Sequence, residues 1–138
     1  VLAQADVISV HMPFIKGVNY HMINDEFISK MKDGAILINT ARGEVQDIDA
    51  IIRGIEGGKL GGFGTDVLEG ESATFFKNLN GQKLENKSHE KLIDLYPRVL
   101  VTPHIGSYTD EALTNMIEYS YENLRDFLNG EECKNSIA

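Results

Sequence analysis

The chain has 138 residues, 42% of them hydrophobic and 25% charged, which is enough apolar material for the core of about one domain. Its formal net charge of -8 and its lack of a basic run argue against nucleic acid as a partner, because phosphate binding requires clustered Lys and Arg. No apolar stretch approaches the roughly 20 residues that span a bilayer, so no membrane partner is expected, and the single cysteine, Cys133, fits a reducing cytoplasm.

Short apolar segments alternate with amphipathic ones along the chain, which predicts parallel strands connected by helices. Residues 6–10 are rich in β-branched side chains and form the first expected strand. Asn24 is expected to cap a short helix over residues 25–31, which Gly34 ends. Residues 35–39 form the second expected strand, since this apolar run is too short for a helix. We expect both strands to be buried.

A third helix–strand unit follows in the sequence. Either Asp47 or Asp49 begins the expected helix, and Gly57 ends it together with the next glycine. Residues 60–67 then read as a glycine-rich strand. Glycine weakens a strand, so its three glycines predict that another backbone approaches closely. The apolar stripe of the expected helix consists of Ile48, Ile51, Ile52 and Ile55.

The last part of the chain combines a long polar segment, a strand and a long helix. Residues 69–97 are expected to form a functional loop, because loops of this length are uncommon in compact domains. Residues 99–102 form the last expected strand, and a helix should run from Thr109 to about Asn129. We place a candidate domain boundary between this strand and this helix. The apolar stripe of the long helix, expected to face a core or a subunit interface, is Leu113, Ile117, Tyr121, Leu124 and Leu128.

Chemically active residues follow each of the four expected strands. In an open parallel sheet, ligands bind beyond the carboxyl ends of the strands. An Arg, several carboxylates and a His therefore emerge at one edge, which predicts an active site there. In chain order, these residues are His11 to Pro13, Thr40 to Gly43, Asp66 with Glu69 and Glu71, and Pro103 with His104.

These side chains fit a substrate whose carboxylate lies next to a carbon that gains or loses a proton. The planar fork of an Arg can hold a carboxylate in two hydrogen bonds. A His can move one proton at neutral pH, and a carboxylate beside it raises the pKa of that His and fixes its tautomer. Reduction of a 2-oxo acid by a nicotinamide fits this set. An acid–base isomerase or lyase would use the same groups.

Six short motifs occur in order along nearly the whole chain. They are Val7–Pro13, His21–Asn24, Met31–Ala35, Asn39–Gly43, Gly64–Glu69 and Val101–Gly106. Together they resemble the D-isomer-specific 2-hydroxyacid dehydrogenases. The long insertion after Glu71 and the aromatic Tyr108 are more similar to the D-lactate and D-2-hydroxyisocaproate branch than to the phosphoglycerate branch.

The resemblance implies a fold, a domain organisation and an activity. The fold would be α/β, with residues 1–106 as the second half of a Rossmann-type parallel sheet that binds NAD. Residues 107–138 would be a long helix and tail that return to the substrate domain. The implied activity is NAD-dependent reduction of a 2-keto acid to a D-2-hydroxy acid, of the D-lactate or D-2-hydroxyisocaproate type. The full-length protein would be a homodimer.

The resemblance also implies roles for single residues. Arg42 would bind the carboxylate and carbonyl of the substrate. His104 would donate the proton in reduction and accept it in oxidation, with Glu71 as its acidic partner and Glu69 as a nearby rival for that role. No metal site is expected, because the acids and histidines lack ligand spacing. The residues that would line the NAD site are Met12, Pro13, Asn19, Thr40, Ala41, Arg42 and Asp66.

Most of these residues also have a purely structural interpretation. Asp66 could end a turn, which is common for Asp, and Glu71 could belong to an acidic loop surface. His104 could be a structural histidine, although its place at a strand end favours catalysis. Of the remaining histidines, His21 and His89 are expected to be structural or exposed.

Two other classes of function remain open from the sequence. The same fold can serve as a non-enzymatic dinucleotide-sensing or corepressor-like binding module, although a pure binder has no need for the proton donor His104. The chain could also be a truncated structural remnant that folds only as an oligomer, which its size and an exposed sheet edge would allow. Turnover of 2-keto acids with NADH by the full-length protein would separate the dehydrogenase from the binding module.

We expect residues 1–138 alone to bind NADH weakly or not at all. The glycine-rich phosphate loop of the family is not found in this sequence, because the glycines of residues 61–64 lie within an expected strand instead of a strand-to-helix turn. The chain has no initiator Met and opens on an apparent helix end, which suggests the later part of a longer protein. Calorimetric titration of the isolated chain tests this expectation, and micromolar NADH binding would contradict it.

Overall fold

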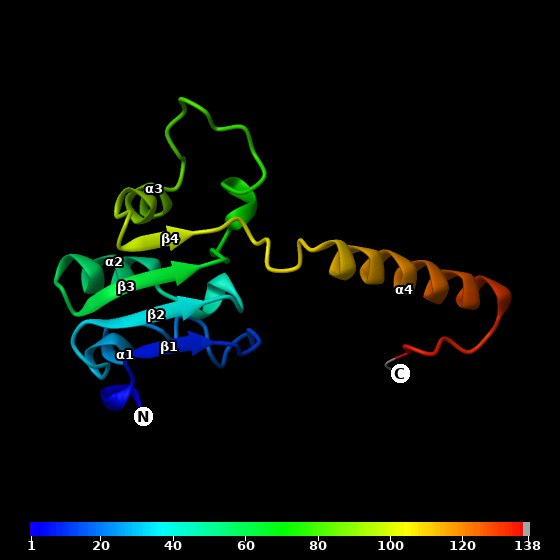
Figure 1. Ribbon diagram of the computed structural model, residues 1–138, viewed down its shortest axis with the longest axis horizontal. Helices are drawn as coiled ribbons and strands as arrows, with labels where there is room; N and C mark the ends of the chain where they lie inside the picture. The colour runs from blue at the N-terminus through cyan, green and yellow to red at the C-terminus, as the bar shows by residue number, and fades with distance from the viewer. Residues whose placement is uncertain (137–138) are drawn as a thin grey trace. The chain divides into compact units, whose positions relative to one another are not determined.

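The computed structural model describes residues 1–136 and places four parallel strands in one sheet, in the order β1-β2-β3-β4 (Figure 1). By its internal contacts the chain forms two compact units, Val1–His104 and Ile105–Ala138, and the sheet belongs to the first. The predicted α/β fold with a parallel sheet is therefore confirmed. The strands are β1 (Val7–Val10), β2 (Ala35–Asn39), β3 (Leu60–Thr65) and β4 (Val99–Val101).

Three helices connect the strands, and the predicted side chains cap two of them. Asn24 Oδ1 accepts a hydrogen bond from the Phe27 amide at 3.1 Å, and Asp47 Oδ1 accepts one from the Ala50 amide at 3.1 Å. Asp47, not Asp49, is therefore the cap of the second helix. The helices are α1 (Asp25–Ser29), α2 (Ile48–Glu56) and α3 (Lys87–Asp94), with short 3-10 turns η1 (Leu2–Gln4), η2 (Gly43–Val45) and η3 (Glu71–Ala73).

The two faces of the sheet differ in burial. On one face, Leu37 lies in register with Phe63, which lies in register with Val99, and all three are buried beneath the helices. On the other face, Val7 is 53%, Ile36 43% and Leu100 58% exposed. The prediction of fully buried strands was therefore wrong for β1 and β2. The helices of this unit form a single layer, so they cover only one face.

The segment expected to be one long loop contains a helix. Asn86 Oδ1 accepts hydrogen bonds from the amides of Ser88 at 3.0 Å and His89 at 3.2 Å. It thereby starts α3, whose Leu92 is completely buried. The prediction of an unstructured segment was wrong because Asn and Ser favour both loops and helix starts.

The glycines of β3 have different roles. A Cβ at Gly61 would lie 2.3 Å from the carbonyl oxygen of Gly34, so the predicted close approach is present at this residue. The nearest atoms to a Cβ at Gly62 and Gly64 would be 3.5 Å and 3.9 Å away, which is ordinary contact. The close approach is therefore to the chain's own backbone and needs no ligand.

The second unit consists mainly of α4 (Asp110–Asn129). Thr109 Oγ1 accepts a hydrogen bond from the Ala112 amide at 3.2 Å, and Gly130 ends the helix with a φ of 70°. Its apolar stripe is largely exposed, with Ile117 at 69% and Leu128 at 72%, and its burial in a core or interface stays a prediction. Within the described part of the chain, no helix has the length and apolarity to span a bilayer.

His89 connects α3 to the segment that precedes it. Its Nδ1 lies 2.9 Å from Thr74 Oγ1 beside η3, and the residue is only 1% exposed. Burial lowers the pKa of His89 below its usual value of 6.5, and the main chain and charge of Glu69 oppose this shift only in part. His89 is thus structural, as expected, and neutral in the folded chain at neutral pH.

His89 should make the stability of the chain depend on pH. The unfolded chain protonates this ring below about pH 6.5, whereas the folded chain does so only at lower pH. The contribution of the neutral, buried His89 ring to the free energy of unfolding is therefore complete above the pKa of the unfolded state. It is lost as the pH falls toward the lower pKa of the folded state. We expect the melting temperature to decrease from neutral to mildly acidic pH by less in His89→Gln than in the wild type. An identical decrease in both proteins would contradict this assignment.

Candidate active site

A hollow of about 330 Å³ at the carboxyl edge of the sheet brings the three predicted catalytic side chains together. Arg42 reaches it from the segment after β2, Glu71 from the segment after β3, and His104 from the segment after β4. These segments meet because parallel strands end at the same edge. The lining residues are Arg42, Gly43, Glu44, Val67, Leu68, Gly70, Glu71, Ser72 and His104.

The centre of this hollow is a pair formed by Glu71 and His104. Glu71 Oε1 lies 2.5 Å from His104 Nδ1, and Glu71 Oε2 accepts a hydrogen bond from the Leu68 amide at 3.0 Å. A carboxylate can only accept, so Nδ1 carries the proton and Nε2 is left for another partner. The ring of His104 is 41% exposed. The pair can therefore exchange a proton with a bound molecule through Nε2.

Glu69, the rival acid, belongs to a second pair. Its Oε2 lies 2.7 Å from His21 Nε2, and its Oε1 accepts a hydrogen bond from the Tyr20 hydroxyl at 2.9 Å. That hydrogen bond to the carboxylate raises the pKa of Tyr20 above its usual value of 10.0. The structure thus brings Glu71, and not Glu69, into contact with His104.

Arg42 lies on the exposed side of the hollow. One guanidinium nitrogen, Nη1, donates a hydrogen bond to the Ala41 carbonyl oxygen at 2.6 Å. Within residues 1–136, Arg42 takes part in no ion pair. An Arg has five N–H donors in a fixed fork, so most of them remain for an anionic group.

Two buried amides shape the Arg42 turn, and the sequence interpretation missed both. Asn39 Oδ1 accepts a hydrogen bond from the Ala41 amide, and Asn39 Nδ2 donates to the Arg42 carbonyl oxygen, each at 2.9 Å. Asn39 Nδ2 also donates to Gln46 Oε1 at 2.7 Å, and Gln46 Nε2 donates to the Val67 carbonyl oxygen at 3.0 Å. Both amides are fully buried. The available signal was that Asn39, a polar residue, ends the apolar strand β2.

Gly43 lets the Arg42 turn approach the Glu71 turn. A Cβ on Gly43 would lie 2.1 Å from the carbonyl carbon of Leu68 and 2.2 Å from the amide nitrogen of Glu69. Both are backbone atoms, so no side-chain rotation could relieve the overlap. A glycine at this position is therefore required for the hollow to form.

The residues expected to line a cofactor site follow β1, β2 and β3 at the same edge. Pro13 and Thr40 are exposed, whereas Met12 and Ala41 are half-buried. They offer a partly apolar border suited to a flat aromatic ring. Asp66 is 7% exposed, and its Oδ1 accepts a hydrogen bond from Thr102 Oγ1 at 2.6 Å, which joins the ends of β3 and β4.

Asn19 supports this border from within. Its Oδ1 accepts a hydrogen bond from the Ile15 amide at 2.7 Å, and its Nδ2 donates to the Pro13 carbonyl oxygen at 2.8 Å. The side chain is buried, so its amide holds the segment after β1 in shape. The residues present fit a nicotinamide ring at this edge, while a cradle for the phosphates is not found in the sequence.

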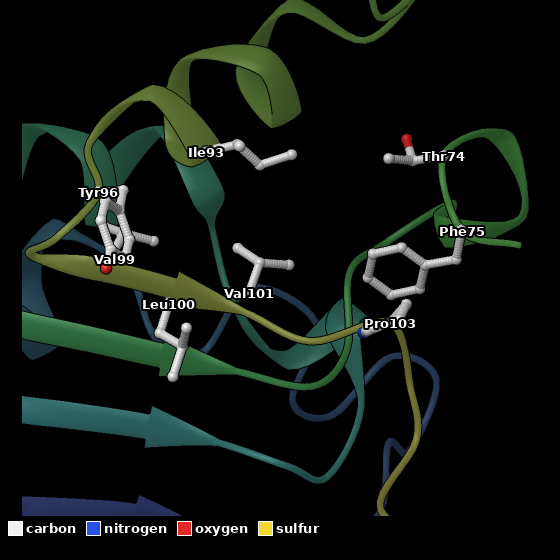
Figure 2. Close-up of a pocket in the computed structure, with 8 residues that line it drawn as sticks. All are labelled: Thr74, Phe75, Ile93, Tyr96, Val99, Leu100, Val101 and Pro103. Atoms are coloured by element: carbon white, nitrogen blue, oxygen red, sulfur yellow. The ribbon is translucent and has the colours of Figure 1, made fainter. Parts of the chain in front are cut away.

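A second hollow of about 320 Å³ lies beside β4 and α3. Figure 2 shows Phe75 and Pro103 close together near its end, with Ile93 and Val101 also lining it. Apart from Thr74 and Tyr96 its lining is apolar, and it contains no His, carboxylate or Arg. The described residues also contain no cluster of His, Cys, Asp or Glu suited to a metal ion. The polar hollow around His104 is therefore the better candidate for catalysis.

Comparison with known proteins identifies the family. Residues 1–106 match the family model described as D-isomer specific 2-hydroxyacid dehydrogenase, NAD binding domain. The chain belongs to this family. The structure is similar to that of D-lactate dehydrogenase with NAD+ from Lactobacillus jensenii, with a TM-score of 0.89 and 36% identity, over 99% of this chain and 41% of that chain. The resemblance to this family that the six sequence motifs indicated is thereby confirmed.

Two relatives show how much of their own length the chain matches. It is 42% identical to the aromatic 2-oxoacid reductase of Clostridium sporogenes, over 98% of this chain. It is 41% identical to the D-lactate dehydrogenase of Lactobacillus delbrueckii subsp. bulgaricus, over 97% of this chain. The matched region covers 40% of the length of each relative.

Replacing Gly43 with Ala should separate the Arg42 and Glu71 turns. The added methyl group overlaps backbone atoms, so we expect a loss of stability of about 1–3 kcal/mol. Gly64→Ala is the matched control, because its Cβ would meet its nearest atom at 3.9 Å. Thermal unfolding followed by circular dichroism measures both variants. A Gly43→Ala protein as stable as Gly64→Ala would show that the two turns are not in close contact.

Proposed function

We propose that the protein containing this chain reduces a 2-oxo acid to the D-2-hydroxy acid with NADH, and catalyses the reverse oxidation with NAD+. The observation that carries the proposal is the Glu71–His104 pair beside Arg42 in one hollow. Membership of the D-isomer specific 2-hydroxyacid dehydrogenase family supports the same reaction.

Arg42 binds the substrate in this proposal. A 2-oxo acid presents a carboxylate next to the carbonyl that is reduced, and the guanidinium fork matches a carboxylate with two parallel hydrogen bonds. No acid of the described residues neutralises Arg42. The buried amide of Asn39 hydrogen-bonds to the turn that carries Arg42, so the backbone from which the Arg42 side chain extends is held in place.

His104 moves the proton. In reduction, the protonated ring donates the Nε2 proton to the carbonyl oxygen, which becomes the hydroxyl of the product, and in oxidation Nε2 takes this proton back. Glu71 accepts a hydrogen bond from the Nδ1–H group throughout, so the ring stays oriented and the imidazolium charge is balanced. A bound nicotinamide supplies the hydride, which no side chain can provide.

The cofactor site combines residues from three strand ends. We propose that the side chains or backbone of these residues border the nicotinamide, with NAD preferred to NADP on the grounds of the family. Asn19 acts by shaping the segment after β1. The proposed set is Met12, Pro13, Asn19, Thr40, Ala41, Arg42 and Asp66.

The organisation of the whole protein also remains a proposal. Residues 1–106 would form the later half of the NAD-binding domain, and residues 107–138 would belong to the substrate domain. We propose a cytoplasmic homodimer that acts on a small 2-oxo acid of the D-lactate or D-2-hydroxyisocaproate type. A non-enzymatic binding module is the alternative, and the hydrogen-bonded Glu71–His104 pair argues against it.

Replacing His104 with Ala in the full polypeptide that contains this chain tests the proposal. Loss of the acid–base group should lower kcat by a factor on the order of 10² or more. NADH affinity should remain, because His104 is not among the residues proposed to line the cofactor site. Steady-state kinetics and NADH fluorescence titration measure the two quantities. Near wild-type turnover would remove His104 from the mechanism, and a wild type that binds NADH without reducing 2-oxo acids would favour the binding module.

A further inference from the structure

Two His–Glu pairs share one turn of the chain. Glu69 pairs with His21 at 2.7 Å, and Glu71, two residues later, pairs with His104 at 2.5 Å. Both histidines have left-handed backbone conformations, with φ of 48° at His21 and 52° at His104. A residue with a Cβ adopts this conformation at a cost and persists in it where surrounding contacts impose it. Both pairs are therefore built into the fold.

The carboxylate of Glu69 is held on both oxygens. The Tyr20 hydroxyl donates to Oε1 at 2.9 Å, and His21 Nε2 lies 2.7 Å from Oε2. The two rings stack on each other, with centroids 3.9 Å apart and an interplanar angle of 15°. The side chain of Glu69 thus has little freedom, which restricts the backbone that leads to Glu71.

His21 also contacts the other catalytic turn. Its backbone amide donates a hydrogen bond to the carbonyl oxygen of Glu44 at 2.9 Å, two residues after Arg42. Through its ring it contacts the turn that carries Glu71, and through its backbone the turn that carries Arg42. One residue therefore bridges the two turns beside the Gly43 contact.

The His21–Glu69 pair does not line the catalytic hollow. Leu68, Gly70, Glu71 and Ser72 line the hollow with His104. Glu69 and His21 line a different hollow of about 170 Å³. Any effect of this pair on catalysis must therefore pass through the backbone of the turn.

We propose that His21 and Glu69 are positioning residues, which fix the turn at residues 68–72 so that the Glu71 carboxylate stays against Nδ1 of His104. This proposal rests on the proposed dehydrogenase function, because its consequence is the correct His104 tautomer. Tyr20 contributes the second hydrogen bond to Glu69. The pair contacts neither substrate nor the reacting atoms.

The test uses His21→Leu and His21→Gln in the full polypeptide that contains this chain. Both variants place a non-His residue at the same left-handed position, but only Gln retains a side-chain N–H that can reach Glu69. We expect His21→Leu to lower kcat on the order of 10-fold or more, since small displacements of catalytic groups have large effects. KM for the 2-oxo acid should change far less, and His21→Gln should restore most of kcat.

Combination with Glu71→Gln distinguishes positioning from a general loss of structure. If His21 acts through Glu71, then His21→Leu should change kcat by no more than about 2-fold in the Glu71→Gln background. The ring ¹⁵N chemical shifts of His104 give a second readout without substrate. They should show one tautomer in the wild type and in His21→Gln, and a mixture in His21→Leu.

Each result has a defined meaning. Wild-type kcat in His21→Leu, or the same factor lost with and without Glu71, overturns the positioning role while leaving the dehydrogenase intact. A wild-type protein that reduces no 2-oxo acid overturns the proposed function, and the positioning role fails with it. If His21→Leu does not fold, Tyr20→Phe replaces it. Lower kcat in Tyr20→Phe that disappears with Glu71→Gln supports the proposal, and unchanged kcat overturns it.

Discussion

The contact between the Gly43 turn and the backbone of Leu68 and Glu69 is the constraint on which the rest of the site depends. Without a Cβ, Gly43 lets two loops from neighbouring strands touch through their main chains. The buried amides of Asn39 and Gln46 then join the same two loops by hydrogen bonds. Such buried polar contacts are costly unless every partner is present. The loops therefore have one arrangement, in which Arg42 and Glu71 border a common hollow.

The histidines of this chain owe their different characters to their surroundings. His89 is enclosed, and burial lowers its pKa, so it serves the structure as a neutral ring. His104 and His21 each contact a carboxylate and remain partly open to solvent. His104 alone lies in a hollow with Arg42. His104 and His21 therefore share a residue type and a carboxylate contact. What distinguishes His104 as the candidate acid–base group is its location beside Arg42.

Local signals in the sequence predicted most of the elements, and the family resemblance predicted the Glu71–His104 pair, whereas the other contacts between distant segments were out of reach. Asn24 was predicted as a cap because this role needs only the next three residues. The start of α3 at Asn86 was missed because the same residue types also favour loops. The partner of Glu69 is His21, which is 48 positions away in the sequence, and no local pattern predicts that contact. The family motifs supplied Arg42 and His104. They also include Asn39, but neither its supporting role nor that of Gln46 was predicted.

The open face of the sheet has a consequence for the behaviour of this unit in solution. Val7, Ile36 and Leu100 expose apolar surface on strands whose opposite face is closed by helices. Exposed apolar sheet surface favours association between molecules. The formal net charge of residues 1–104 is -3, from 11 Lys and Arg against 14 Asp and Glu, and it opposes association by a weak repulsion. Salt screens that repulsion without weakening the apolar contact. Higher ionic strength should therefore favour self-association of the isolated unit.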